Sequence, residues 1–273
     1  MIAFASNSLL CRAALRQANI DAATFTSIRI LSGAVALWLI VKLRGAALNR
    51  AGTWPSAIAL FVYAAAFSFA YNTLAAGTGA LLLFSAVQAT MIFWGLRKGE
   101  RLHPIQIVGL IVAMIGLTVL LFPGLSAPPV GGSILMLGAG VAWGTYSLRG
   151  KGETKAVSAT AGNFLRAVPF AAVVSLISLP WVRLDRAGIF YATVSGAITS
   201  GLGYVIWYRA LPGLKASSAA TVQLSVPVLA ATGGILLLGE RITLRYSLAS
   251  LAVLSGIALV VIENKERRIR RRW

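Results

Sequence analysis

The sequence predicts an all-α integral membrane protein of ten transmembrane helices, arranged as two inverted five-helix repeats with both termini in the cytoplasm. Three observations predict this class: the composition, the recurrence of apolar stretches, and a motif that occurs twice. Of the 273 residues, 58% are hydrophobic and only 12% are charged, whereas a soluble domain has roughly 25% charged residues. The apolar stretches recur from end to end, and most approach the roughly 20 residues that cross about 30 Å of hydrocarbon. No segment remains for a sizeable soluble domain.

Charged residues, glycines and prolines separate the apolar stretches into ten predicted spans. They are approximately residues 1–16, 22–42, 54–75, 78–97, 104–122, 131–148, 157–181, 187–210, 215–238 and 243–263. The first span is short and carries Arg12 and Arg16 near its end, where arginine side chains reach toward the membrane surface.

The distribution of positive charge predicts the orientation of the spans. Most Lys and Arg residues lie on the side shared by the N-terminus, the even-numbered connections and the C-terminal tail. The opposite side carries only Arg12, Arg16, Arg183, Arg186, Arg241 and Arg245. Because basic residues gather on the cytoplasmic side, both termini are expected there, in a bacterial inner membrane.

A repeat divides the chain into two halves. Gly99-Glu100-Arg101 recurs as Gly239-Glu240-Arg241, and Ser27-Ile28-Arg29 aligns with Phe164-Leu165-Arg166. Each half holds five predicted spans, and since five is odd, the second half enters the membrane in the opposite direction. The expected units are residues 1–122 for the first repeat, 123–130 for a linker, 131–263 for the second repeat and 264–273 for a basic cytoplasmic tail.

These motifs, in this order, resemble those of the drug/metabolite transporter superfamily, specifically its EamA-type members. The likeness rests on the two Gly-Glu-Arg motifs, on Pro227 upstream of Glu240, on Ala142-Trp143-Gly144 and on the arginines of spans two and seven. It implies export of amino acids or related small metabolites through a central cavity between the repeats. Within the family the chain looks most like the YddG-type amino-acid exporters. It departs from the pattern at Ala5-Ser6-Asn7, where Trp-Gly is often found.

The residue inventory argues against other classes of protein. His103 is the only histidine and Cys11 the only cysteine, so no catalytic residue, metal site or cofactor is expected. The net charge of +18 is spread over short connections and the tail, which favours contact with the lipid bilayer over nucleic-acid binding. The alternatives to export that stay open are exchange of nucleotide sugars or phosphate esters, and a non-transporting receptor or assembly subunit.

All acidic residues fall at predicted span ends or in connections: Asp21, Glu100, Glu153, Asp185, Glu240, Glu263 and Glu266. Proton-driven transporters usually place an ionisable group in the path of the substrate. We therefore expect facilitative transport by alternating access without a buried carboxylate.

Polar and aromatic side chains within the spans are the candidates for a cavity that holds a small-molecule substrate. The candidates are Asn7, Arg29, Phe67, Tyr71, Asn72, Gln88, Trp143, Tyr146, Asn163, Arg166, Tyr204, Trp207 and Gln223. Arg29 and Arg166 lie about eight residues inside their spans, roughly 12 Å at helical rise. Each either bonds the carbonyls of a neighbouring helix end or attracts a substrate carboxylate. The amides either bond between helices or contact the substrate.

Prolines and glycines predict how the helices bend and pack. Pro169 and Pro227 fall near the middle of spans seven and nine, so we expect kinks there and a role as hinges in alternating access. The pairs Gly140 with Gly144 and Gly95 with Gly99 are expected to let helices approach closely.

Overall fold

The computed structural model describes residues 1–46, 51–99, 101–124, 127–151, 153, 155–210 and 222–270, and this part of the chain is helical, without a strand. Its helices are α1 (Ile2–Gln17), α2 (Ala22–Leu43), α3 (Trp54–Ala70), α4 (Ala76–Arg97), α5 (Pro104–Leu121), α6 (Val130–Gly150), α7 (Ala156–Ile177), η1 (Leu179–Trp181), α8 (Arg186–Val194), η2 (Ser195–Leu202), α9 (Gly203–Ala210), α11 (Ser225–Leu238) and α12 (Leu244–Arg270). The segments α8, η2 and α9 follow one another without a break, and η2 is a π-helix.

Among the described residues, five helical segments are long and apolar enough to cross a membrane. They are α2, α4, α5, α7 and the continuous segment Arg186–Ala210. The apolar side chains of Ile111, Met114 and Ile115 on α5 are more than half exposed on the surface, as lipid-facing side chains are. The prediction of an all-helical membrane protein is therefore confirmed.

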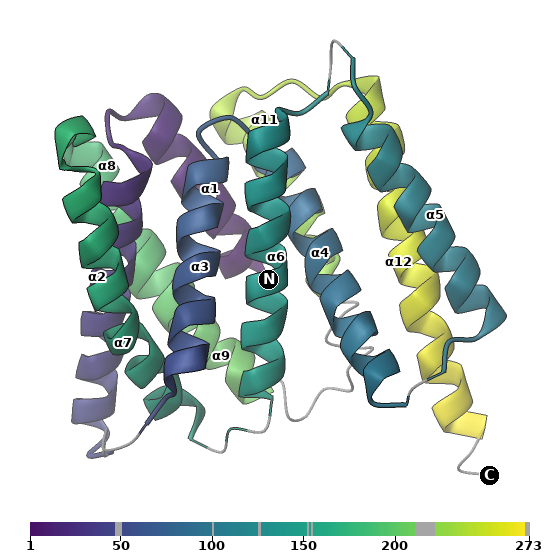
Figure 1. Ribbon diagram of the computed structural model, residues 1–273, viewed down its shortest axis with the longest axis horizontal. Helices are drawn as coiled ribbons and strands as arrows, with labels where there is room; N and C mark the ends of the chain where they lie inside the picture. The colour runs from purple at the N-terminus through teal and green to yellow at the C-terminus, as the bar shows by residue number, and fades with distance from the viewer. Residues whose placement is uncertain are drawn as a thin grey trace.

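The helices pack around a core formed by both halves of the chain (Figure 1). Helix α6 packs against α3 and α4, α2 packs against α7 and η2, and α11 packs against α4 and α1. Helices α5 and α12 pack against each other and form one edge of the molecule. The arrangement brings α1, α2 and α3 of the first half against α6, α7 and η2 of the second half.

Glycines set the approach of α6 to α4. A Cβ atom at Gly140 would lie 2.6 Å from the Cβ of Ala86, and one at Gly144 would lie 2.9 Å from the Cβ of Thr90, so both positions need glycine for close packing. The other predicted pair is wrong in part. Gly99 has a φ of +86° and follows the end of α4, where glycine relieves the strain of the left-handed conformation.

The two intramembrane prolines differ in their surroundings. Pro169 lies inside a continuous α7. Near Pro227 the chain is helical at Val222 and Gln223, turns at Leu224 and resumes as α11 at Ser225. Proline has no backbone N–H, so Pro227 cannot donate a hydrogen bond to the carbonyl of Gln223, four residues earlier. The helix is therefore interrupted directly after Gln223. The helix is interrupted three residues before Pro227 and is not interrupted at Pro169, and the kinks and the hinge role of both prolines stay predictions.

Helix α2 begins at a charged cap that also ties two connections together. The Asp21 carboxylate accepts hydrogen bonds from the backbone N–H of Thr24 and from that of Arg183, both at 2.9 Å. Partial burial would raise the pKa of Asp21, but these hydrogen bonds outweigh burial and lower the pKa below its ordinary value.

Replacing Asp21 with Ala is expected to lower the free energy of unfolding by about 1 kcal/mol at neutral pH, the usual cost of losing an N-cap. Because the folded-state pKa of Asp21 is depressed, its contribution is present above the unfolded-state pKa and is lost as the pH falls through the folded-state value. The melting temperatures of the wild type and the variant, measured across the acidic pH range, should therefore converge as the pH falls. A difference that is constant with pH would show that the carboxylate charge plays no part.

Candidate functional site

Aromatic side chains from both halves meet in the middle of the bundle. Trp143 on α6 contacts Tyr204 on α9 with ring centroids 4.7 Å apart, and contacts Tyr63 on α3 at 5.0 Å. Phe4 on α1 packs edge to face against Trp143 and Trp207 at 5.5 and 5.8 Å. We call this group, together with Asn7, Arg29 and Phe67, the central cluster.

Arg29 is a buried cation in the central cluster, with 1% of its surface exposed. Its guanidinium donates hydrogen bonds of 3.1 Å to the hydroxyls of Tyr63, Tyr204 and Ser200. The rings of Tyr63 and Phe67 lie 5.2 and 5.0 Å from its central carbon, close enough for cation–π attraction. Within the described ranges the one ion pair is that of Arg12 with Glu240, so no carboxylate there neutralises Arg29.

The π-helix η2 positions three hydroxyls around Asn7. The side-chain oxygen of Asn7 accepts hydrogen bonds from Ser195 at 2.8 Å, from Thr199 at 2.5 Å and from Ser200 at 3.3 Å. In a π-helix the hydrogen bonds run from i to i+5, so each turn is wider than in an α-helix. The wider turn lets neighbouring Thr199 and Ser200 both reach one acceptor, and Ser200 then links Asn7 to Arg29.

Three nitrogen donors in the central cluster lack an acceptor within the described part of the chain. They are Nδ2 of Asn7, Nη1 of Arg29 and Nε1 of Trp207, all buried. An unsatisfied buried donor costs about 1–3 kcal/mol, and more when it is charged. Three such donors in one cluster are matched by a ligand that supplies oxygen acceptors, ideally with negative charge.

A cavity of about 250 Å³ opens at the end of the bundle that carries the α2–α3 and α6–α7 connections, and no residue of the central cluster lines it. Its lining includes Tyr146, Asn163 and Tyr208 deep inside, with Arg149 and Glu153 nearer the mouth. The ring of Tyr146 lies 5.7 Å from that of Trp143. Tyr146 therefore separates the inner wall of this cavity from the central cluster.

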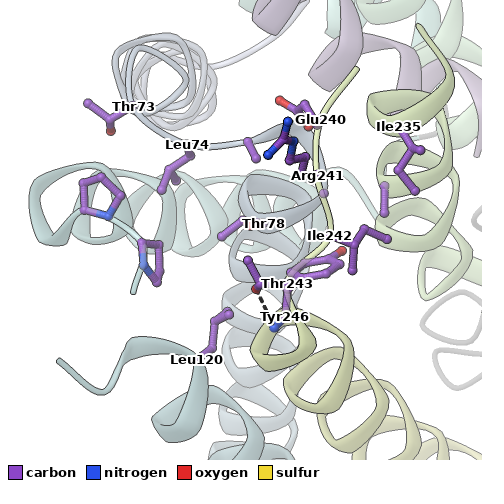
Figure 2. Close-up of a pocket in the computed structure, with 15 residues that line it drawn as sticks. Thr73, Leu74, Thr78, Leu120, Ile235, Glu240, Arg241, Ile242, Thr243 and Tyr246 are labelled. Carbon is purple, nitrogen blue, oxygen red and sulfur yellow. Dashed lines mark hydrogen bonds between the residues drawn. The ribbon is translucent and has the colours of Figure 1, made fainter. Parts of the chain in front are cut away.

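A second cavity, of about 210 Å³, opens at the opposite end of the bundle, at the α3–α4, α5–α6 and α11–α12 connections. Figure 2 shows the residues that line it. Thr73, Leu74 and Thr78 line it from the first half, and Glu240, Arg241, Ile242, Thr243 and Tyr246 line it from the second half. The two cavities thus open at opposite ends of the bundle.

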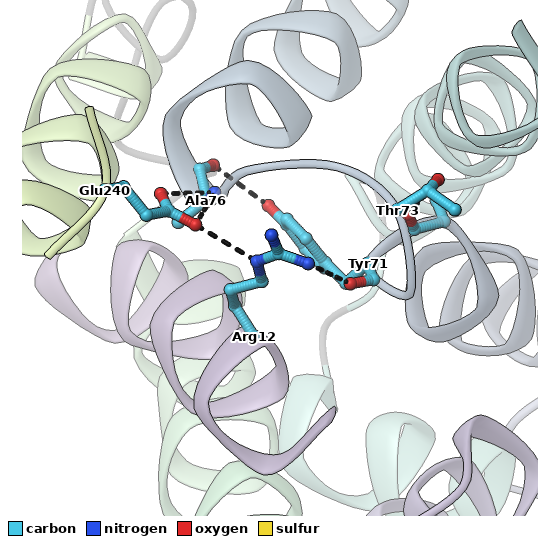
Figure 3. A network of polar contacts seen from close by, with 6 residues as sticks. Arg12, Tyr71, Thr73, Ala76 and Glu240 are labelled. Atoms are coloured by element: carbon cyan, nitrogen blue, oxygen red, sulfur yellow. Dashed lines mark hydrogen bonds and ion pairs between the residues drawn. The ribbon is translucent and has the colours of Figure 1, made fainter. Parts of the chain in front are cut away.

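An ion pair lies between the second cavity, which Glu240 lines, and Tyr71 beside the central cluster (Figure 3). Arg12 on α1 donates to Glu240 at 3.0 Å and to the backbone carbonyl of Tyr71 at 2.9 Å. Glu240 also accepts a hydrogen bond of 2.8 Å from the backbone N–H of Ala76, at the positive end of α4. One carboxylate therefore joins α1, α4 and the end of α11, and the Tyr71 ring packs 4.8 Å from that of Phe67 in the cluster.

The structure brings together part of the predicted cavity set. Asn7, Arg29, Phe67, Trp143, Tyr204 and Trp207 belong to the central cluster, Tyr71 adjoins it, and Tyr146 and Asn163 line the 250 Å³ cavity. Gln223 is buried just before the break at Leu224.

Three predicted residues lie elsewhere. Asn72 is exposed in the turn after α3, because the helix ends at Ala70 and not near residue 75. Arg166 donates to the backbone carbonyls of Ala51 and Gly162, at 2.5 and 3.0 Å, which is the first of the two roles considered for it. Gln88 is buried and lines a groove between α4, α5, α6 and α12.

Several residues of the site were missed by the sequence reasoning. Tyr63 lies one helical turn before Phe67 and extends an aromatic stripe that was visible at Phe67 and Tyr71. Arg12 was expected to reach the membrane surface, but it is buried against Glu240, a pairing between residues far apart in the sequence. No local signal marks the hydroxyls of η2, since a π-helix has no distinctive pattern in the sequence.

Comparisons with known proteins agree with the fold. Residues 1–122 and 130–262 each match the EamA-like transporter family. An uncharacterized protein of Pseudomonas aeruginosa is 55% identical over 271 residues, covering 99% of this chain and 94% of the relative. A probable amino-acid metabolite efflux pump of Escherichia coli is 25% identical over 71% of this chain and 70% of its own. The threonine/homoserine exporter RhtA of Salmonella typhimurium is 28% identical over 70% of this chain and 64% of its own.

A solved structure has the same fold, with a TM-score of 0.69 and 18% sequence identity. The match covers 97% of this chain and 95% of the other.

Proposed function

The chain belongs to the EamA-like transporter family, and from that premise we propose that it exports amino acids or related small metabolites across the inner membrane. In this proposal ten spans form two inverted five-helix repeats, residues 1–122 and 131–263, with both termini in the cytoplasm. The linker 123–130 joins them, and residues 264–273 form a basic tail against the lipid.

Arg29 carries the proposal for the substrate. A buried guanidinium without a carboxylate in the described residues, and with Nη1 unpaired, is stabilised by a ligand that brings a carboxylate. Nδ2 of Asn7 and Nε1 of Trp207 add donors of the same kind. The aromatic faces of Phe4, Trp143 and Tyr204 suit the ammonium group and apolar side chain of an amino acid.

The two cavities support alternating access. They open at opposite ends of the bundle, and the bridge of Arg12 with Glu240 lies between one of them and Tyr71 beside the cluster. A substrate that binds the cluster from one cavity leaves through the other after the bridge opens. Pro169 and Pro227 are the proposed hinges.

Nucleotide sugars and phosphate esters fit the cluster less well. These substrates carry more negative charge than one carboxylate, and Arg166, the second intramembrane arginine, is bonded to backbone carbonyls away from the cluster. Arg29 alone balances a single carboxylate.

Counterflow in proteoliposomes tests the proposal. Liposomes loaded with an unlabelled neutral amino acid are expected to accumulate the labelled form, whereas the corresponding amino-acid amides should neither exchange nor compete, because they lack the carboxylate. Sugar nucleotides are the matched alternative substrates, and exchange of these alone would contradict the proposal. Absence of any saturable exchange would favour a receptor, and uphill flux driven by an imposed pH gradient would exclude the facilitative mechanism.

A further inference from the structure

A lateral groove lies outside the substrate path, on the side of α4 that faces α5 and α12. Its volume is about 260 Å³, and we define it by Ala89, Ile92, Leu117, Val141, Val253 and Ile257 among its lining residues. None of the central-cluster residues lines it. Figure 1 shows α5 and α12 side by side at the edge of the bundle, beyond α4.

The groove is apolar over most of its lining, which also includes the Gln88 amide and the hydroxyl groups of Ser85 and Thr90. Ser85 donates to the carbonyl of Leu81 and Thr90 to that of Ala86, both at 2.7 Å, so these hydroxyls are satisfied within α4. Hydrocarbon is therefore a suitable occupant and water is not, because a water molecule needs several polar partners.

Basic residues lie beyond one end of the lateral groove, outside its lining, and we call them its basic end. Helix α4 ends at Arg97, and Lys98 and Arg101 follow in the connection to α5. The chain that joins two walls of the groove therefore carries three positive charges against one negative charge, that of Glu100. All three side chains are exposed. The guanidinium of Arg97 lies 4.5 Å from the Phe93 ring, and the Lys98 ammonium lies 5.4 Å from the Trp94 ring. Cations beside interfacial aromatics mark the level of lipid headgroups.

We propose that the lateral groove binds one acyl chain of an anionic phospholipid, with the headgroup phosphate at Arg97, Lys98 and Arg101. The apolar groove and the basic end together match the two parts of such a molecule.

Native mass spectrometry of the purified, delipidated full chain tests this with phosphatidylglycerol and phosphatidylcholine that carry the same acyl chains. The wild type is expected to retain one phosphatidylglycerol in preference to phosphatidylcholine. Loss of two basic residues in Arg97→Gln/Lys98→Gln should weaken phosphatidylglycerol retention about 30-fold and leave phosphatidylcholine unchanged. Ala89→Trp, at an exposed position in the groove, should remove the bound lipid.

The controls separate this site from general lipid contact. Val35→Trp, on the exposed surface of α2, should retain phosphatidylglycerol as the wild type does. Val141→Trp fills the groove from α6. It is used in place of Ala89→Trp if Ala89→Trp melts at a lower temperature than the wild type in lipid-free detergent. Equal retention of both lipids by the wild type, unchanged retention in the groove variants, or a dimer whose formation excludes lipid would overturn the proposal.

Discussion

Replacing Arg29 with Met is expected to reduce transport of a carboxylate substrate roughly 100-fold without lowering the stability of the protein. A charge-assisted hydrogen bond contributes about 1.5–3 kcal/mol, and 1.4 kcal/mol corresponds to tenfold in affinity. The substrate-free protein, by contrast, has no carboxylate within the described residues to balance this buried charge. An apolar side chain of similar length removes that cost, and this gain is expected to offset the three hydrogen bonds and two cation–π contacts that are lost with Arg29. Counterflow and thermal unfolding of the same samples measure both effects.

Arg29→Lys and Arg166→Met are the matched controls for that substitution. Lysine keeps the charge but cannot offer the planar pair of donors, so its transport should fall between those of the wild type and Arg29→Met. Arg166→Met removes the other intramembrane arginine, which bonds backbone carbonyls, and should leave substrate affinity unchanged. Parallel losses of transport and melting temperature in Arg29→Met would instead assign Arg29 a purely structural role.

Replacing Glu240 with Gln is expected to open the end of the bundle that the ion pair is proposed to close. The neutral amide keeps the shape but removes the charge that pairs with Arg12 and faces the N-terminus of α4. A loss of about 2 kcal/mol from the closed state would raise the open population roughly 30-fold. Cys11, the only cysteine, is fully buried beside Arg12 and serves as a natural reporter. Its rate of reaction with a maleimide should rise by the same factor.

Glu153→Gln makes the same chemical change at the mouth of the opposite cavity. The Glu153 carboxylate accepts a hydrogen bond from the backbone N–H of Lys155 and joins no ion pair among the described residues. Cys11 in this control should react as slowly as in the wild type. If Glu240→Gln also leaves Cys11 unreactive, the pair of Arg12 with Glu240 does not hold the closed state.

The sequence predicts where the helices begin and end more accurately than it predicts which side of each helix faces the protein interior. The span predicted at 22–42 corresponds to α2 at Ala22–Leu43, and that at 104–122 to α5 at Pro104–Leu121. Charged and turn-forming residues mark where a chain meets water, so such ends are visible locally. Asn72 was misplaced because no charge or proline separates the end of α3 from the turn that follows.

The identity of the inward face was harder to predict because lipid and protein interior are both apolar. Arg29 and Arg166 occupy matching places in the repeat and similar depths, yet one lies in the central cluster and the other meets Ala51 at a helix connection. The pairing of Arg12 with Glu240 depends on two helices from different halves, which no local pattern encodes. The sequence therefore identifies Arg29 as a candidate for the site but does not distinguish it from Arg166.

The π-helix η2 has a consequence for how relatives of this chain should be aligned. An α-helix advances about 100° per residue, so one residue gained or lost before Gly203 would turn everything after it by that angle. Tyr204 and Trp207 would then leave the central cluster and face a different neighbour. A one-residue gap at η2 between two relatives thus indicates either that only one of them has the π-turn, which absorbs the extra residue, or that different aromatic side chains face the central cluster.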